Sequence, residues 1–514
     1  MAINNSRIAK NTLFLYFRMF LVMGISILTA GVTLRVLGKV DYGLYAVLGG
    51  IVAMFSFLNG SLSSAVSRNI TFELGKGDVQ RTREIFNVSL LIFAFLALII
   101  ILLSETIGLW FFYQKMIIPA ERMPVAFWVF QLSIINIPFV VTQIPYNAVL
   151  VAHENMKIYA YVSIADAIVK LLIVYALVVS PFDKLITLAF LHFVWGIISV
   201  GFYRVYCIKK YRETCLMFCR DWKIYKSILT YAGSDIIGNL SCVVQGQGLN
   251  LLLNTFFGPV VNAARGIAYG LQGMTTRFSG GFMTAVVPQI IKSYANGDYS
   301  GMWRLVERSA SFSVYLIWML ALPAWLEGDY VLKLWLGDYP EHTLTFFHLI
   351  VIICLIDISR RAIITIIHAT GHVFWENVIV GSVLCLSFPF AYICLRMGYA
   401  PESVFWCTIG AMIIGGILEM FVLRHYHRYN IFSYVISVYG RCFLVIALSS
   451  VIPWAMYSRF MEPCFLRMIL TGVITTISVA VAVLYVGMSS ADRTRIYEIL
   501  RNKLKSIVRF WREI

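Results

Sequence analysis

Arginine side chains stand inside stretches of the sequence that are otherwise apolar. Arg277 lies near the middle of one such stretch, and Arg18 lies nearer the end of another. A guanidinium at mid-membrane depth costs at least about 2.5–3.5 kcal/mol unless water or a partner meets it. We therefore interpret Arg277 as lining a polar cavity, with a structural ion pair as the alternative. For Arg18, a cavity position and snorkelling to the membrane interface both stay open. Arg265, nearer the outer end of its stretch, is expected to be less informative.

The stretch at 227–256 carries the most amide and acidic side chains. At 100° per residue, four of them fall within a helical sector of about 100°, and a fifth lies just beyond it. The stretch at 11–37, its equivalent in the first half, has a polar stripe of its own. Two polar-striped helices at equivalent places indicate a shared central cavity. The candidate residues at 227–256 are Asn239, Gln247, Asn250 and Asn254, with Asp235 on the same stripe.

Acidic and basic residues are paired at helical spacing inside two further stretches. Asp166 and Lys170 are four residues apart, and Asp357 precedes Arg361 by the same interval. Residues four apart share a helix face, so each pair is less costly to bury than either charge alone. The pairs are either internal salt bridges or parts of a gate or an ion-coupling site. Asp166, Asp235 and Asp357 are the candidate coupling acids.

The composition indicates the elements that must position these residues. The chain has 514 residues, of which 60% are hydrophobic and 13% are charged, and its mean hydropathy is +0.80. Such a chain is a polytopic membrane protein, and stretches of about 20 apolar residues span a bilayer as helices. We therefore predict an all-α fold with about fourteen spans. They lie at 11–37, 42–66, 86–112, 124–150, 158–180, 185–206, 227–256, 260–287, 308–336, 343–369, 373–396, 402–424, 433–458 and 464–487.

An internal repeat fixes the expected architecture. The segment Gly38–Asp78 matches Gly258–Asp298 without a gap, with 10 identities in 41 positions. A repeat of this kind indicates two copies of one structural unit, here of six helices each. We predict an N-lobe at 1–206, a cytoplasmic inter-lobe loop at 207–226, a C-lobe at 227–424, two accessory spans at 425–487, and a basic amphipathic tail at 488–514.

The chain has a net charge of +16, and the distribution of its basic residues fits the predicted topology. Basic residues concentrate in alternate loops, so the positive-inside rule places those loops and both termini in the cytoplasm. The charge matches no nucleic-acid-reading motif, and we expect no nucleic-acid partner. The ten cysteines lack the spacing of a zinc site, and most lie inside spans as small apolar filler. No Walker motif is present, so we expect no cofactor and no direct use of ATP.

Two sequence motifs carry a resemblance to a known family. Residues 11–18, Asn-Thr-Leu-Phe-Leu-Tyr-Phe-Arg, are followed by Leu-Gly-Lys-Val-Asp-Tyr-Gly-Leu-Tyr at 37–45. This opening resembles the bacterial O-antigen and polysaccharide flippases of the multidrug/oligosaccharidyl-lipid/polysaccharide (MOP) exporter superfamily, in which a Leu-Gly-x-x-x-Tyr-Gly turn follows the first helix. The Gly-Asp loops at 77–78 and 297–298 also fit that branch.

The resemblance implies a fold, a location and a substrate. The fold would be a V-shaped bundle of two lobes that works by alternating access in the bacterial inner membrane. The substrate would be an undecaprenyl-pyrophosphate-linked oligosaccharide for O-antigen and lipopolysaccharide assembly, with polysaccharide polymerase and assembly proteins as partners beside membrane lipids. Arg18 and Arg277 would then bind the diphosphate, and the amides would bind the glycan. Sodium ions, protons or the membrane potential could supply the energy.

Three other functions stay open on the sequence. A multidrug cation antiporter shares the fold but is expected to use cavity acids rather than arginines. A membrane glycan polymerase or ligase would be an enzyme, but we find no large external loop and no catalytic constellation, so we expect no enzyme. A scaffold without transport activity would have little use for a mid-membrane arginine and paired acids.

Overall fold

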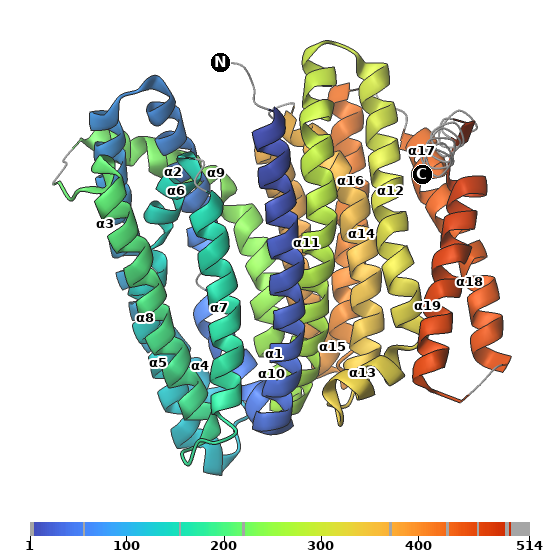
Figure 1. Cartoon of the computed structure of the whole chain (residues 1–514), viewed down its shortest axis with the longest axis horizontal. Helices are drawn as coiled ribbons and strands as arrows, with labels where there is room; N and C mark the ends of the chain where they lie inside the picture. Colours follow the sequence, from blue (N-terminus) through green and yellow to red (C-terminus); the bar gives the residue numbers. More distant parts are fainter. Residues whose placement is uncertain are drawn as a thin grey trace, which may run out of the picture. The chain divides into compact units, whose positions relative to one another are not determined.

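The computed structural model of the chain is built from helices (Figure 1). It describes residues 5–54, 57–153, 156–217, 221–369, 373–427, 431–459, 462–488 and 493–494, and no strand occurs among them. The α-helices are α1 (Asn5–Met54), α2 (Phe57–Lys76), α3 (Val79–Leu103), α4 (Leu109–Gln114), α5 (Met123–Val141), α6 (Ile144–Ala152), α7 (Met156–Ala176), α8 (Lys184–Lys210), α9 (Trp222–Val243), α10 (Leu249–Phe257), α11 (Pro259–Ala295), α12 (Tyr299–Leu326), α13 (Gly328–Leu336), α14 (Thr343–Ala369), α15 (Val373–Arg396), α16 (Ser403–His427), α17 (Ile431–Tyr434), α18 (Arg441–Arg459) and α19 (Phe465–Ala482).

Short π-helical and 3₁₀ turns link several of these helices. The π-helical turns are η1 (Ser104–Gly108), η4 (Val244–Gly248), η5 (Val435–Gly440) and η6 (Val483–Gly487), and the 3₁₀ turns are η2 (Ala120–Arg122) and η3 (Arg212–Thr214). Each predicted apolar stretch consists mainly of helix, in places as two helices joined by such a turn. Nine helices within the described ranges are long and apolar enough to cross a membrane. The prediction of an all-α polytopic protein is confirmed.

The two copies of the repeat have matching backbone geometry. Gly38 and Gly258 have φ values of 79° and 78°, and Gly77 and Gly297 have values of 79° and 74°. Positive φ is favourable for glycine and strained for other residues, so these positions end one helical segment and start the next. The aspartates at 78 and 298 then cap the following helices, accepting the backbone N–H three residues on at 2.8 and 2.9 Å.

The chain divides into two compact units, each described here by itself. Unit 1 comprises Met1–Gly270, Trp335–Phe346 and Asn377–Ala411, and unit 2 comprises Leu271–Leu334, Phe347–Glu376 and Met412–Ile514. Unit 1 thus joins the first half of the chain to α9, α10 and part of α11. The lobe boundaries expected from the repeat stay a prediction.

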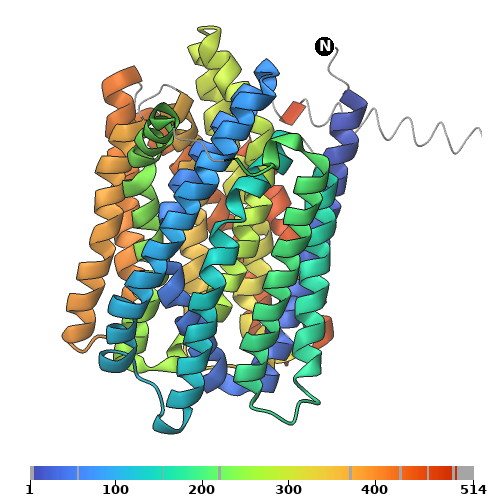
Figure 2. The ribbon, with the colours of Figure 1, turned by 90° about the vertical axis from the view of Figure 1, so that its left-hand side faces the viewer.

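Unit 1 has an extensive apolar core. Helices α3, α5, α7 and α8 run side by side (Figures 1 and 2), and α7 also packs on α1. Phe86, Phe112 and Phe130 are fully buried, and the rings of Phe112 and Phe130 stack with centroids 5.5 Å apart. Aromatic pairs of this kind add to the stabilisation from buried area. This core is the frame on which the polar residues of unit 1 are held.

In unit 2 the last helices pack onto α12. Helix α12 lies against both α18 and α19. The indole of Trp318 on α12 donates to the hydroxyl of Ser449 on α18, at 3.1 Å. Arg467 of α19 donates to the carboxylate of Glu327, which follows α12, at 2.8 Å. Removal of one partner of a buried ion pair leaves the other charge unpaired and destabilises the folded protein. This ion pair therefore holds α19 against the end of α12.

Candidate functional site

A polar cluster lies in unit 1 where α10, α11 and the second half of α1 meet. Asn262 of α11 is fully buried, and its side-chain amide donates to the backbone oxygen of Asn250 at 2.7 Å and to its Oδ1 at 2.9 Å. Asn250 in turn donates to the backbone oxygen of Ala46 on α1 at 3.4 Å. Amide hydrogen bonds therefore join α1, α10 and α11, and such bonds are strong where water is excluded.

Arg265 of α11 is the charged member of the cluster. Its guanidinium is buried and donates to the backbone oxygens of Gly246 at 2.5 Å and Gln245 at 3.3 Å. These carbonyls belong to η4, the π-helical turn between α9 and α10, where the regular helical bonding is interrupted. The ring of Tyr269 lies 3.8 Å from the guanidinium carbon. Across the described ranges no carboxylate forms an ion pair with Arg265.

Arg265 therefore differs from the expectation that it would be uninformative. From the sequence we expected it nearer the outer end of its stretch and less informative, and the structure packs it against η4, between α9 and α10. Its sequence signal was weak, because only tertiary packing brings it to Gln245 and Gly246, 20 and 19 residues earlier. The available signal was the pair Gly246 and Gly248, because two glycines so close together disfavour a regular helix at that point.

Glycines on α1 permit close contact with this cluster. A Cβ at Gly50 would lie 2.8 Å from Oε1 of Gln247 and 3.0 Å from Nδ2 of Asn250. A Cβ at Gly43 would lie 1.8 Å from the backbone oxygen of Pro259, the first residue of α11. Only glycine fits where two helix backbones approach so closely. The predicted residues Gln247 and Asn250 thus lie at the contact between α10 and α1.

Asn254 lies one turn further along α10 and is fully buried. Its Oδ1 accepts the backbone N–H of Ile117 at 3.0 Å, whereas its Nδ2 has no hydrogen-bond partner within the described part of the chain. A buried donor of this kind is unfavourable unless water or a ligand reaches it. Asn239, on α9, is half-buried. The structure therefore brings Gln247, Asn250 and Asn254 together on η4 and α10, and it places Asn239 on the preceding helix.

Two other predicted residues lie outside the described side chains. Arg277 on α11 and Asp235 on α9 fall at positions whose side chains the structure does not describe. Their roles stay predictions. The same holds for the amphipathic helix expected at 488–514, of which the structure describes only residues 488, 493 and 494.

At the end of unit 1 that the charge pattern predicts to be outer, the last residues of α13 and those that follow it are fastened to α1. The indole of Trp335 donates to the backbone oxygen of Ile27 at 2.8 Å and fills the space left by Gly31. Arg35 donates to the backbone oxygens of Trp335 and Leu336 at 2.7 and 3.3 Å. Residues at intervals of four share a helix face, so α1 presents one continuous edge to this segment. We call these contacts, together with the ion pair of Lys39 and Asp338 at 2.7 Å, the outer latch.

At the opposite end of unit 1, α9 is joined to α2 and α3. Arg81 near the start of α3 bonds to Asp221 at 2.8 Å and to Glu84 at 2.7 Å. Asp221 is also the N-cap of α9 and accepts the N–H of Lys223. The hydrogen bond from Arg81 lowers the pKa of the Asp221 carboxyl below its ordinary value, and the N–H of Lys223 acts in the same direction. Both ends of unit 1 therefore join first-half to second-half segments.

The predicted pair on α7 forms as expected. Lys170 donates to Asp166 at 2.8 Å, and the indole of Trp195 on α8 donates to the other carboxylate oxygen at 2.9 Å. One turn before Asp166, the hydroxyl of Ser163 accepts a hydrogen bond from Arg18 at 3.1 Å. Arg18 thus faces α7 in unit 1 and contributes to the contact between α1 and α7. Whether these residues act in coupling stays a prediction.

In unit 2, the predicted residues Asp357 and Arg361 also pair, at 2.8 Å. The neighbouring Arg360 points to a different partner, Glu419 of α16, with Nε 3.0 Å from Oε2. Arg360 and Glu419 are both buried, whereas Asp357 and Arg361 are each about one-third exposed. Asp357–Arg361 and Arg360–Glu419 are therefore two separate ion pairs, of which Arg360–Glu419 joins α14 to α16.

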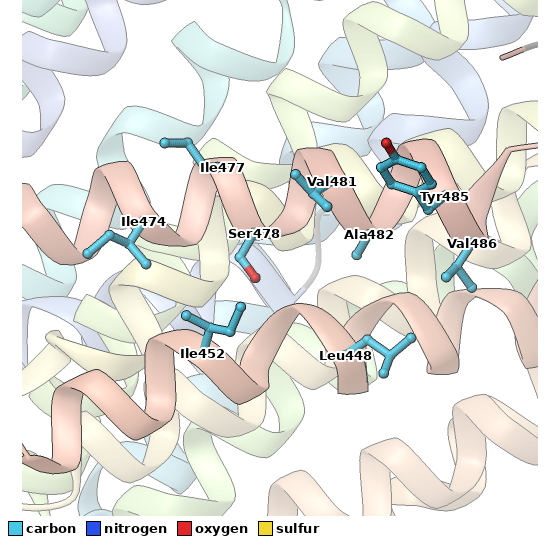
Figure 3. A pocket seen from close by; sticks show the side chains of 9 residues that line it. All are labelled: Leu448, Ile452, Ile474, Ile477, Ser478, Val481, Ala482, Tyr485 and Val486. Atoms are coloured by element: carbon cyan, nitrogen blue, oxygen red, sulfur yellow. The ribbon is translucent and has the colours of Figure 1, made fainter. Parts of the chain in front are cut away.

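An apolar groove of about 370 Å³ lies between α18 and α19 in unit 2 (Figure 3). Apart from Tyr485, the only lining side chain with a hydroxyl is Ser478, which donates a hydrogen bond to the backbone oxygen of Ser449 at 2.7 Å. A smaller pocket next to it shares Ile474 and reaches Tyr457 and Arg467. The groove is lined by Leu448, Ile452, Ile474, Ile477, Ser478, Val481, Ala482, Tyr485 and Val486.

The described residues contain no group of three or more His, Cys, Asp or Glu side chains that could hold a metal ion. The site is instead a set of amides, one buried guanidinium and several ion pairs. Amides and guanidinium groups can donate hydrogen bonds to anions and to hydroxylated ligands.

Comparison with known proteins gives the fold a name. No family model matches the chain, and no curated protein matches it in sequence. Among solved structures, the lipid II flippase MurJ in an inward closed conformation is similar with a TM-score of 0.67 at 16% identity, over 92% of this chain and 98% of that one. An outward-facing MATE-family multidrug transporter and a MOP superfamily transporter from Pyrococcus furiosus Vc1 each give 0.56 at 16% identity, over 81% of this chain and 95% of theirs. The chain therefore has the fold of the MOP superfamily transporters.

Proposed function

We propose that this protein moves a lipid-linked oligosaccharide, with undecaprenyl pyrophosphate as its lipid, from the inner to the outer leaflet of a bacterial inner membrane. The observation that carries the proposal is the extent of the structural likeness. The likeness to the lipid II flippase covers 92% of the chain, whereas the likeness to the MATE transporters covers 81%. Residues 1–424, which the sequence predicts to hold the twelve spans of the two lobes, are about 82% of the chain (424 of 514). The likeness to the lipid flippase therefore extends over more of the chain than residues 1–424, whereas the likeness to the MATE transporters does not.

The polar cluster suits the head group of such a substrate. A diphosphate needs cationic donors when it crosses hydrocarbon, and guanidinium groups bind phosphate in two-pronged fashion. Arg265 supplies a buried guanidinium that forms no ion pair within the described ranges, and Arg18 and Arg277 are further candidates. The amides of Gln247, Asn250, Asn254 and Asn239 supply donors and acceptors for sugar hydroxyls.

The groove between α18 and α19 suits the lipid part of the substrate. Its lining is almost entirely aliphatic, and α18 and α19 present many exposed apolar side chains, as lipid-facing helices do (Figure 3). Each buried CH₂ contributes roughly 0.8 kcal/mol, so an apolar groove can hold part of a polyprenyl chain. Ordinary membrane lipids would occupy it in the absence of substrate.

Transport by alternating access requires contacts that form and break at each end. The outer latch and the Arg81–Asp221 pair are such contacts at the two ends of unit 1. Asp166, Asp235 and Asp357 are the acids that could couple these changes to sodium ions, protons or the membrane potential, with Lys170 and Arg361 as their helical partners. Polysaccharide polymerase and assembly proteins are the partners that such a substrate would need.

A multidrug cation antiporter is the second candidate, because the MATE transporters share the fold. One observation favours it, namely the half-buried carboxylate of Asp166, which is the kind of group that binds organic cations. The ion pair with Lys170 and the buried Arg265 favour an anionic ligand instead.

Lipid extraction separates the two candidates. Cells lacking the protein should accumulate one undecaprenyl-linked oligosaccharide, detected by mass spectrometry, and should lose the matching surface polysaccharide. Re-expression of the wild-type chain should restore both. A normal lipid pool with intact surface glycan would reject the flippase proposal, and a lower resistance to organic cations would then support antiport.

A further inference from the structure

Two cysteines face each other across the hairpin of α15 and α16 in unit 1. Cys394 lies near the end of α15, Cys407 lies near the start of α16, and their Sγ atoms are 3.9 Å apart. Both thiols are half-buried rather than enclosed in the core. A disulfide bond needs about 2.0 Å between the sulfur atoms, and rotation about the two Cα–Cβ bonds can close a gap of this size when the backbones are already adjacent.

The backbone around the pair is firmly held. The carbonyl of Cys394 accepts the N–H groups of Met397 at 3.1 Å and Tyr399 at 3.2 Å, in a turn where Gly398 has a φ of 86°. This pattern is a glycine-ended helix terminus, which fixes the direction of the chain. On the other side, the carboxylate of Glu402 is hydrogen-bonded to the ring of His342 at 2.6 Å. The backbone oxygen of Glu402 accepts the N–H of Trp406 at 3.2 Å. The two sulfur atoms are therefore kept close by the fold.

The pair also lies within reach of an aqueous reagent. Cys394 is two residues from the end of α15 and Cys407 is four residues into α16, so both lie within about 6 Å of the helix ends at 1.5 Å per residue. The neighbouring side chains of Met397, Tyr399 and Trp406 are exposed. Exposed aromatic residues at helix ends are typical of the membrane–water interface.

The charge pattern of the sequence places this hairpin on the outer side of the membrane, where thiols are oxidised. We propose that Cys394 and Cys407 form a disulfide bond in the cell and so fasten α15 to α16. The oxidant is a disulfide-bearing oxidoreductase. The thiolate of one cysteine attacks that disulfide and forms a mixed disulfide, and the other cysteine then attacks it. Two electrons and two protons pass to the oxidant, which leaves as a dithiol.

Peptide mapping tests the proposal on the full-length protein. Cells are quenched with an alkylating reagent before lysis, and the purified protein is cut after arginine without reduction. Cleavage after Arg361, Arg396 and Arg424 places Cys394 in the peptide 362–396 and Cys407 alone in 397–424. We expect these peptides as one cross-linked species, two hydrogen masses below their sum, which separates on reduction. Both peptides alkylated in the quenched cells would overturn the proposal.

Matched variants assign the bond to its cysteines. The peptide 362–396 also contains Cys385, whose thiol lies 3.4 Å from the hydroxyl of Ser241. We expect the cross-link to persist in Cys385→Ser and to disappear in Cys394→Ser and in Cys407→Ser, with all three proteins present in the membrane fraction. Loss of the cross-link in Cys385→Ser alone would overturn the assignment. Because the test does not measure transport, its outcome is separate from that of the flippase proposal.

Discussion

Gly38 and Gly258 stand 220 residues apart and have almost the same backbone conformation, with φ values of 79° and 78°. Each lies at the junction between two helical segments, and each is followed forty residues later by a Gly-Asp pair that starts the next helix. A residue with a Cβ is strained by roughly 1–2 kcal/mol in this conformation. The two copies of the repeat therefore turn at equivalent glycines with the same backbone conformation, and glycine is favoured at that point.

Substitution of this glycine should destabilise the protein. We expect Gly38→Ala and Gly258→Ala each to cost about 1–2 kcal/mol of unfolding free energy, because alanine disfavours positive φ. Gly270→Ala is the matched control, since it lies inside α11 with nothing within 4 Å of an added Cβ. The measurement is thermal unfolding of the detergent-purified protein. Equal midpoints for all three variants would contradict the argument.

The close contact of α1 with α11 gives a second prediction. An alanine at Gly43 would put its Cβ 1.8 Å from the backbone oxygen of Pro259, so the two helices must move apart. We expect Gly43→Ala to reduce export by on the order of tenfold or more, as core overpacking costs about 1–3 kcal/mol. Gly49→Ala, where an added Cβ meets nothing within 4 Å, should keep wild-type export. Complementation of surface polysaccharide in a deletion strain provides the comparison.

Arg265 gives a third prediction, on the polar cluster. Arg265→Ala removes the donors to the backbone oxygens of Gly246 and Gln245, and with them the positive charge beside η4. We expect export to fall by about a factor of ten or more, since buried carbonyls lose charge-assisted hydrogen bonds of roughly 1.5–3 kcal/mol. Arg265→Lys should retain part of the activity, because it keeps the charge but not the planar fork.

The control for Arg265 is Arg396→Ala, which removes an exposed arginine in the same unit. Its export and its level in the membrane should match the wild type. If Arg265→Ala is present at the wild-type level and exports normally, Arg265 has no part in substrate binding.

The outer latch gives a fourth prediction, on alternating access. A short reducible cross-link between Lys39→Cys and Asp338→Cys should hold the latch closed, because the native side chains already meet at 2.7 Å. We expect export to stop on cross-linking and to return when the link is reduced. The single-cysteine variants under the same treatment are the controls. Continued export with the link in place would mean that the latch does not open during transport.

The opposite end of unit 1 gives a fifth prediction, on pH. Arg81 lowers the pKa of the Asp221 carboxyl. The contribution of Asp221 to the stability of the start of α9 is therefore present above the ordinary pKa of an aspartate, and it is lost as the pH falls through the lowered pKa. Asp221→Asn should therefore increase amide hydrogen exchange in the first turn of α9 at neutral pH. In the wild type, the same increase in amide exchange should appear only in strong acid, where the Asp221 carboxyl is protonated. Lys223→Ala, which keeps the backbone N–H that Asp221 accepts, is the control.

The sequence by itself determined the features that depend on local geometry. Apolar length sets helical spans, so the all-α polytopic fold could be predicted from composition and periodicity. Spacing by four sets which side chains share a helix face, so the pairs Asp166–Lys170 and Asp357–Arg361 form as predicted. The repeat also predicted where helices turn, because positive φ and N-capping are properties of single residues and their nearest neighbours.

Only the tertiary structure decided the contacts between residues far apart in the chain. Arg360 pairs with Glu419 across 59 residues, and Trp335 reaches Ile27 across 308. Arg265 similarly finds its partners where a π-helical turn exposes carbonyls on another helix. Such contacts depend on which helix faces meet and how closely glycines let them approach, and a single sequence does not encode that packing in any local pattern. The sequence therefore named Gln247, Asn250 and Asn254, but it gave no sign of Asn262, which bonds to Asn250, or of the bonds from Arg265 to the carbonyls of η4.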